Sequence, residues 1–143
     1  METEKGVALV VYKKPGRFPR YLVLNRKKNW EGWELPKGHL EEDSYRKTVE
    51  IELREETGIE EVEEIEETDR TLEWTYEDDG QKYRKKYRVY IVRVDEDSYV
   101  DVSGNPCDEH EKGHFFNFED AKSLLTYENY SEALTRAHHT ITD

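Results

Sequence analysis

Residues 32–39, Gly-Trp-Glu-Leu-Pro-Lys-Gly-His, constrain the fold most, because they contain two glycines and a proline. Glycine permits backbone angles that other residues avoid, and proline lacks the amide hydrogen that a helix needs. A loop with special backbone geometry is therefore predicted here. A helix is predicted to follow from about Ser44 to Thr57, since Asp43 or Ser44 can cap its start and Gly58 occupies a common stop position.

Extended segments are predicted on both sides of this loop and helix. Short runs rich in β-branched and aromatic residues are typical of strands, and Pro-Gly or Asp-Gly pairs between them indicate turns. No linker or internal repeat is visible, so residues 1–143 are predicted to form a single domain. The predicted strands are Val7–Tyr12, Tyr21–Leu24, Val62–Tyr76, Tyr83–Val94 and Gly113–Phe116, with a loop at Asp95–Glu111 and closing helices at Phe118–Leu125 and Glu128–Thr140.

The composition restricts the ligands that the chain can bind. Charged residues make up 39% of the chain and the formal net charge is -12, which repels nucleic acid and anionic membranes at long range. A phosphate-bearing ligand would need bound metal ions or a local basic patch. Cys107 is the single cysteine, which excludes an intramolecular disulfide and a thiolate zinc cluster. The N-terminus lacks a secretory signal and no apolar run approaches the roughly 20 residues that span a bilayer, so a cytoplasmic protein is expected.

Three glutamates on the predicted helix suggest a metal site. Glu52, Glu55 and Glu56 are spaced i, i+3 and i+4, so they share one helix face. Like charges at this spacing repel each other, and a hard cation such as Mg²⁺ or Mn²⁺ would cancel the repulsion. The alternative is a solvated acidic face, which is common in a chain this rich in glutamate.

The residues around these glutamates resemble the Nudix box, G-x5-E-x7-R-E-U-x-E-E-x-G-U, where U is a bulky aliphatic residue. Its second half matches Glu52–Ile59, and Gly38 matches its first glycine. Two positions depart from the pattern. Ile51 replaces the arginine that orients the carboxylates, and the interval after Gly38 is one residue short, so Glu42 or Asp43 must replace the usual glutamate.

The resemblance implies an α/β (α+β) fold with a mixed β-sheet sandwiched between helices. It also implies a pyrophosphohydrolase in which water attacks a phosphorus of a diphosphate. Glu52, Glu55, Glu56 and the carbonyl of Gly38 would hold Mg²⁺ or Mn²⁺, with Glu55 and Glu56 as catalytic residues.

Trp33–His39 resembles the W-x-x-P-K-G-H segment of diadenosine tetraphosphate hydrolases, which makes Lys37 and His39 candidates for substrate binding. The region that begins at Glu109 and His110 resembles a later segment of the same group, and there Glu109 would assist the metal or the water. Glu109 could equally be an ordinary loop acid. Tyr127 could stack on an adenine ring or could pack the last helix against the sheet.

A basic strand offers a second candidate surface for phosphates. Alternation places Lys82, Arg84, Lys86 and Arg88 on one face of the strand. If that face borders the cleft, Lys86 and Arg88 are candidates for binding the far phosphates of a polyphosphate. If it faces outward, these residues form a solvated surface opposite the acidic partner Glu73–Glu77.

The leading prediction is hydrolysis of diadenosine tetraphosphate to ATP and AMP by a monomer that binds a small nucleotide. Nucleoside triphosphates and RNA 5′ ends are alternative substrates, although the net charge disfavours a long nucleic acid. A non-catalytic Nudix binding module is a second hypothesis, supported by Ile51 and the shortened interval. A plain acidic interaction protein would leave the glycine, proline and glutamate spacing unexplained.

Overall fold

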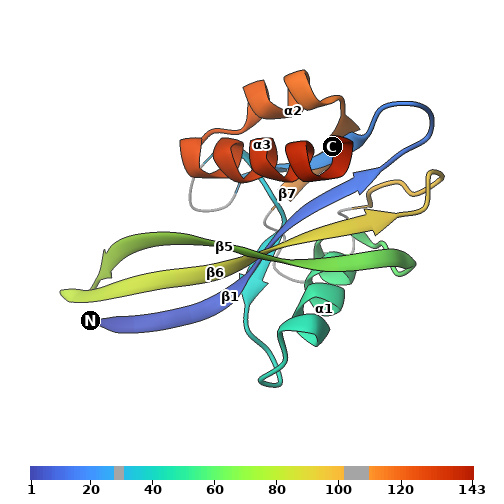
Figure 1. The fold of residues 1–143 in the computed structure, drawn as a ribbon. Coiled ribbons are helices and arrows are strands. Elements are labelled where there is room, and N and C mark those ends of the chain that lie inside the picture. Colours follow the sequence, from blue (N-terminus) through green and yellow to red (C-terminus); the bar gives the residue numbers. More distant parts are fainter. Residues whose placement is uncertain (28–30, 102–109) are drawn as a thin grey trace.

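The computed structural model describes residues 1–27, 31–101 and 110–143, of which 110–112 are described by their backbone alone. The described residues form one seven-stranded sheet and three helices (Figure 1). The strands are β1 (Glu2–Lys13), β2 (Arg20–Arg26), β3 (Gly32–Glu34), β4 (Lys37–His39), β5 (Val62–Asp78), β6 (Gln81–Val94) and β7 (His110–Phe116). The helices are α1 (Tyr45–Thr57), α2 (Phe118–Leu124) and α3 (Glu128–Thr142).

The sheet is mixed, with the main strand order β3-β2-β1-β6-β5, while β4 pairs with β1 and β7 pairs with β2. β1 and β6 run parallel, and the other strand pairs are antiparallel. Helix α1 covers one face, and α2 and α3 cover the other (Figure 1). The predicted mixed sheet between helices is thus confirmed.

Alternation along β1 builds a separate hydrophobic core on each face of the sheet. Ala8 and Val10 point into the core that contains Leu134 of α3. Val7, Leu9 and Val11 point into the core that contains Val49 and Leu53 of α1. Successive side chains of a strand face opposite ways, so a continuous apolar run is what a strand covered on both faces requires.

Local signals predicted the ends of α1 and the β5–β6 hairpin correctly. The side chain of Ser44 accepts a hydrogen bond from the Lys47 N–H (3.2 Å), and Gly58 ends the helix in the left-handed region at φ 77°. Asp79 and Gly80 both have positive φ (52° and 78°), as a tight hairpin turn demands.

The prediction of a loop at residues 32–39 was wrong, since the segment forms β3 and β4 on either side of Leu35 and Pro36. β3 pairs with β2 and β4 pairs with β1, and the Pro36 carbonyl accepts a hydrogen bond from the Leu9 N–H (2.8 Å). Long-range pairing therefore overrides the local signals of glycine and proline. The predicted loop at Asp95–Glu111 lies partly outside the described residues, and its end already belongs to β7.

In the part of the chain that the structure describes, no helix is both long enough and apolar enough to span a membrane.

Candidate active site

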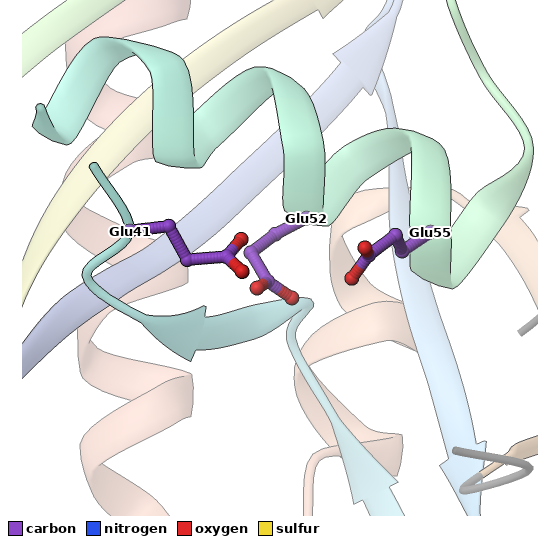
Figure 2. Close-up of side chains that lie close together, drawn as sticks. All are labelled: Glu41, Glu52 and Glu55. Carbon is purple, nitrogen blue, oxygen red and sulfur yellow. The ribbon is translucent and has the colours of Figure 1, made fainter. Parts of the chain in front are cut away.

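Three carboxylates meet between the C-terminal half of α1 and the connection that leads from β4 into this helix (Figure 2). Glu52 and Glu55 project from α1, and Glu41 projects from the connection before the helix. One oxygen from each side chain lies within 4.8 Å of the others. Each of the three residues is partly buried. Mutually repelling hard oxygens at this spacing are suited to a divalent cation such as Mg²⁺ or Mn²⁺.

Glu41 is the member of the acid cluster that the sequence did not predict. Its N–H donates to Thr48 Oγ1 (2.8 Å), and the Thr48 hydroxyl is 2.7 Å from the Ser44 carbonyl, which ties the connection to the first turn of α1. Glu42 and Asp43 adopt positive φ (53° and 54°) and are exposed. The expectation that one of these two replaces the usual glutamate finds no support in this cluster, where Glu41 is present instead.

The buried Oε2 atom of Glu41 has no hydrogen-bond partner among the described residues. Buried carboxylate oxygens are normally satisfied by a hydrogen bond or a metal, because desolvation without compensation is costly. The unsatisfied oxygen belongs to a carboxylate that has an oxygen within 4.8 Å of oxygens of Glu52 and Glu55, which fits a cation bound at this cluster.

Gly38 of β4 packs directly against the Glu52 carboxylate. A Cβ atom at position 38 would collide with that carboxylate. The backbone φ of Gly38 is not in the left-handed region, so the backbone conformation does not require glycine. Glycine is needed at position 38 because the Glu52 carboxylate of α1 occupies the space that a side chain would take.

Glu56 lies outside the acid cluster and is almost fully buried, with 5% of its surface exposed. Its Oε2 accepts a hydrogen bond from the Lys37 N–H (3.0 Å). The orientation of this carboxylate is thus held by the β4 backbone, although residue 51 is isoleucine.

Lys37 extends from this backbone contact toward a buried ion pair. Arg26 Nη1 lies 3.0 Å from Glu34 Oε2, and Lys37 Nζ lies 3.9 Å from the other Glu34 oxygen. The Lys37 ammonium also lies 5.7 Å from the centre of the Trp74 ring. Lys37 therefore contacts Glu56 of α1 through its backbone and Trp74 of β5 through its side chain.

A pocket of about 700 Å³ opens next to Lys37, between β5 and β6 on one side and the start of α3 on the other. That volume lies in the range of typical small-molecule sites. Of the predicted substrate-binding residues, Lys37 and Tyr127 line it, and Tyr127 is 50% exposed. The lining residues are Arg26, Lys37, Trp74, Tyr76, Lys85, Tyr127, Glu128, Asn129 and Tyr130.

Lys86 and Arg88 do not line this pocket. Lys86 Nζ lies 3.8 Å from Glu73 on the neighbouring strand, which matches the alternative of a solvated strand surface. Arg88 pairs with Glu67 (3.1 Å) and stacks on the Tyr45 ring of α1 (3.9 Å). Because side chains alternate along β6, Lys85 points toward the pocket, whereas Lys86 and Arg88 of the predicted stripe point to the opposite face.

Sequence reasoning missed Trp74, Tyr76 and Lys85. A usable signal was present in the hairpin: with Asp79 and Gly80 as the turn, counting back pairs Trp74 with Lys85 and Tyr76 with Tyr83. Cross-strand partners share a face of the sheet. The register therefore groups these aromatic rings with Lys85, away from Lys86.

His39 lies at the edge of the site, where its Nε2 is 3.3 Å from Glu4 of β1. The other Glu4 oxygen accepts a hydrogen bond from the Tyr76 hydroxyl (2.6 Å). This hydrogen bond to a carboxylate is the main reason that the pKa of Tyr76 is raised to about 12. Glu109, the remaining predicted catalytic residue, lies outside the described residues.

The model of the NUDIX domain family matches residues 2–137 of this chain. The chain belongs to the Nudix family. Family membership and the Nudix hydrolase structures that it resembles support a pyrophosphohydrolase enzyme. Nudix hydrolases generally use a divalent metal, and the cluster of Glu41, Glu52 and Glu55 provides a chemically suitable site.

Solved structures of other Nudix proteins share the fold. The C. elegans Ap4A hydrolase in its binary complex has a TM-score of 0.74 and 22% identity, with 97% of this chain and 98% of that chain covered. The E. coli dihydroneopterin triphosphate pyrophosphohydrolase has a TM-score of 0.77 and 16% identity, with 98% and 99% covered. The NUDIX domain of Shewanella oneidensis NrtR, complexed with ADP ribose, has a TM-score of 0.74 and 15% identity, with 99% and 90% covered. No curated protein matches this Nudix chain.

Proposed function

We propose that this Nudix protein hydrolyses dinucleoside polyphosphates, with diadenosine tetraphosphate cleaved to ATP and AMP. The observation that carries the proposal is the position of Lys37. Its backbone N–H holds the buried Glu56 of α1, and its side chain lines the pocket on the other side. A phosphate chain that leaves the pocket along Lys37 would therefore reach the carboxylates of α1.

The pocket walls suit a nucleoside at one end and phosphates at the other. Trp74, Tyr76 and Tyr127 bring aromatic rings to the pocket, and the half-exposed ring of Tyr127 offers a face on which a base can stack. Lys37 and Lys85 supply positive charge in a chain whose formal net charge is -12. Such a local positive patch offsets the overall negative charge and allows an acidic protein to bind a polyphosphate.

The acid cluster would hold the divalent cation. Glu41, Glu52 and Glu55 provide carboxylate oxygens, and we assign Glu56 and the Gly38 carbonyl as further ligands, with Mg²⁺ or Mn²⁺ as the cofactor. When bound, such a cation neutralises phosphate oxygens and lowers the pKa of water. Water attacks a phosphorus, the bridging P–O bond breaks, and a proton passes to a carboxylate, for which Glu55 is proposed. Glu109 is kept as a candidate for assisting this proton transfer.

Nucleoside triphosphates and RNA 5′ ends contain the same type of bond and are the alternative substrates. The pocket volume of about 700 Å³ is sufficient for one nucleoside, whereas a long RNA would also meet the acidic remainder of the surface. A small nucleotide is therefore favoured. The single domain, the monomeric state and the cytoplasmic location remain predictions.

The test is product analysis after incubation with diadenosine tetraphosphate and Mg²⁺, with the Glu56→Gln variant as control. Equal amounts of ATP and AMP, formed only by the wild type in the presence of metal, would support the proposal. Turnover of a nucleoside triphosphate in place of the dinucleotide would move the assignment to that substrate. Metal-dependent nucleotide binding without turnover of any of these substrates would indicate the non-catalytic binding module.

A further inference from the structure

Glu4 of β1 lies between the nucleoside pocket and the Gly38 segment. In the sheet register, Glu4 is opposite Lys85 of β6, and Gly6, two residues further on, is opposite His39 of β4. Cross-strand partners share a face of the sheet, so Glu4 lies on the same face as Lys85, which lines the pocket. Residues two apart in a strand also share a face, so Gly6 and its partner His39 lie on that face as well.

The lack of a side chain at Gly6 makes this arrangement possible. A Cβ atom there would collide with the Gly38 carbonyl and with the Tyr87 ring. The absence of that atom lets β4 approach β1 closely, with the His39 ring in edge contact with the Tyr87 ring (6.1 Å between centroids). The His39 side chain thereby comes close to the carboxylate of Glu4, which lies two residues before Gly6 in β1.

The two oxygens of the Glu4 carboxylate lie next to different residues of the site. Oε1 accepts from the Tyr76 hydroxyl (2.6 Å), and Oε2 lies 3.3 Å from His39 Nε2. Its side chain is 27% exposed, whereas that of His39 is 61% exposed. Tyr76 lines the pocket, and His39 directly follows Gly38 in the chain. One partly buried carboxylate thus joins the two halves of the site.

We propose that Glu4 is a positioning residue that fixes Tyr76 and His39 relative to each other. The inference rests on the proposed function, because it takes Tyr76 as part of the nucleoside pocket and His39, next to Gly38, as a residue close to the bound phosphates. The Glu4 carboxylate accepts the Tyr76 hydrogen bond at one oxygen and places its negative charge beside His39 at the other, whereas a glutamine amide is neutral and presents one oxygen and one NH₂ group. Aspartate has the charge but is one methylene shorter and does not span the same distance. Glutamate therefore has both the length and the charge to bind the Tyr76 hydroxyl and attract the His39 imidazole.

Electrostatics and positioning predict opposite effects for the Glu4→Gln variant. If the negative charge merely repelled the phosphates, its removal would tighten nucleotide binding. If Glu4 holds Tyr76 and His39 in place, the variant binds nucleotide more weakly although the repulsion is relieved. The sign of the change in Kd therefore separates the two roles.

The experiment measures the Kd of ADP in the presence of Mg²⁺ by calorimetry, together with kcat and KM for diadenosine tetraphosphate. Glu2→Gln is the matched control, since Glu2 is exposed on the same strand and loses the same charge. We expect Glu4→Gln and Tyr76→Phe each to raise the Kd about tenfold, the size typical of a lost charged hydrogen bond, and the double variant to resemble either single variant. Glu2→Gln should leave the Kd unchanged.

The outcomes are distinct for the two proposals. A wild type that binds ADP and hydrolyses the dinucleotide, with Glu4→Gln unchanged in Kd, kcat and KM, would overturn the role of Glu4 alone. Purely additive effects of Glu4→Gln and Tyr76→Phe would also overturn it, because additivity means that the two residues act independently. ADP binding with the expected coupling but no turnover would retain the role of Glu4 and reject the hydrolase. A wild type that binds no nucleotide would reject both.

Discussion

The backbone N–H of Lys37 donates a hydrogen bond to the buried carboxylate of Glu56, with 3.0 Å between nitrogen and oxygen. The contact joins β4 to the last turn of α1, so the segment that contributes Lys37 to the pocket also holds the acidic helix. Under the proposed function, this contact would link the position of the substrate to that of the Glu56 carboxylate.

The Glu56→Gln variant should lose metal-dependent turnover and keep its fold. Glutamine can still accept the hydrogen bond from Lys37, so the packing around residue 56 is preserved, but the negative charge is gone. The expected fall in kcat is on the order of 10²- to 10³-fold, the range seen when one group that stabilises transition-state charge is removed. Steady-state kinetics and a thermal unfolding curve check both parts. Full activity in this variant would remove Glu56 from the site.

The Gly38→Ala variant should lose metal binding, because the new Cβ displaces the Glu52 carboxylate. The overlap should also cost about 1–3 kcal/mol of stability, as is typical for overpacked sites. Titration with Mn²⁺ and denaturant unfolding provide the two measurements. Gly16→Ala is the control, since an added Cβ there meets no atom within 4 Å. Equal metal affinity in the two variants would contradict the prediction.

Lys85→Ala should raise the KM for the polyphosphate substrate roughly tenfold, corresponding to about 1.4 kcal/mol of lost binding. Lys85 lines the pocket, whereas its neighbour Lys86 pairs with Glu73 on an exposed part of the sheet. Lys86→Ala is therefore the matched control and should leave KM within about twofold, because exposed ion pairs contribute little. If Lys86→Ala had the larger effect, the basic stripe predicted from alternation would be the true phosphate surface.

The Ile51→Arg variant tests whether the missing arginine of the Nudix box limits activity. Glu56 is already oriented by the Lys37 N–H, so the arginine is not needed to hold that carboxylate. We expect the variant to change kcat by less than about twofold, well below the effect of losing a charged group in the site. A large gain in kcat would show that Glu52 or Glu55 is poorly oriented in the wild type.

A stability change at mildly acidic pH should depend on His138. Desolvation lowers the pKa of His138 below its usual 6.5, with the nearby His139 contributing in the same direction. The Tyr21 hydroxyl, whose pKa is raised by burial, is hydrogen-bonded with His138 Nδ1 (2.7 Å), and the Phe118 ring stacks on the imidazole at 3.9 Å.

Because the folded state prefers neutral His138, its contribution to stability is present above pH 6.5 and is lost as the pH falls through the folded pKa. Denaturant unfolding between pH 7.5 and pH 5 should show a decline for the wild type that is smaller in His138→Phe. That variant keeps the ring stack and removes the titrating group. Identical declines would assign the effect to other groups.

The sequence by itself determined the features that depend on neighbouring residues. The start of α1 at Ser44, its end at Gly58 and the Asp79-Gly80 turn follow from local backbone preferences. The positions of Glu52 and Glu55 on one side of α1 follow from helical periodicity alone. These features were predicted because their causes lie within a few residues along the chain.

Tertiary structure decided which side chains meet at the site. Glu41 joins the acid cluster because Thr48 anchors the connection before α1, while Glu42 and Asp43 turn toward solvent. Lys85 lines the pocket and Lys86 does not, because strand register and helix placement determine which face of β6 is the pocket side. These relationships join residues far apart in sequence. Their physical cause is the pairing and packing of whole elements, which local propensity and charge pattern do not contain.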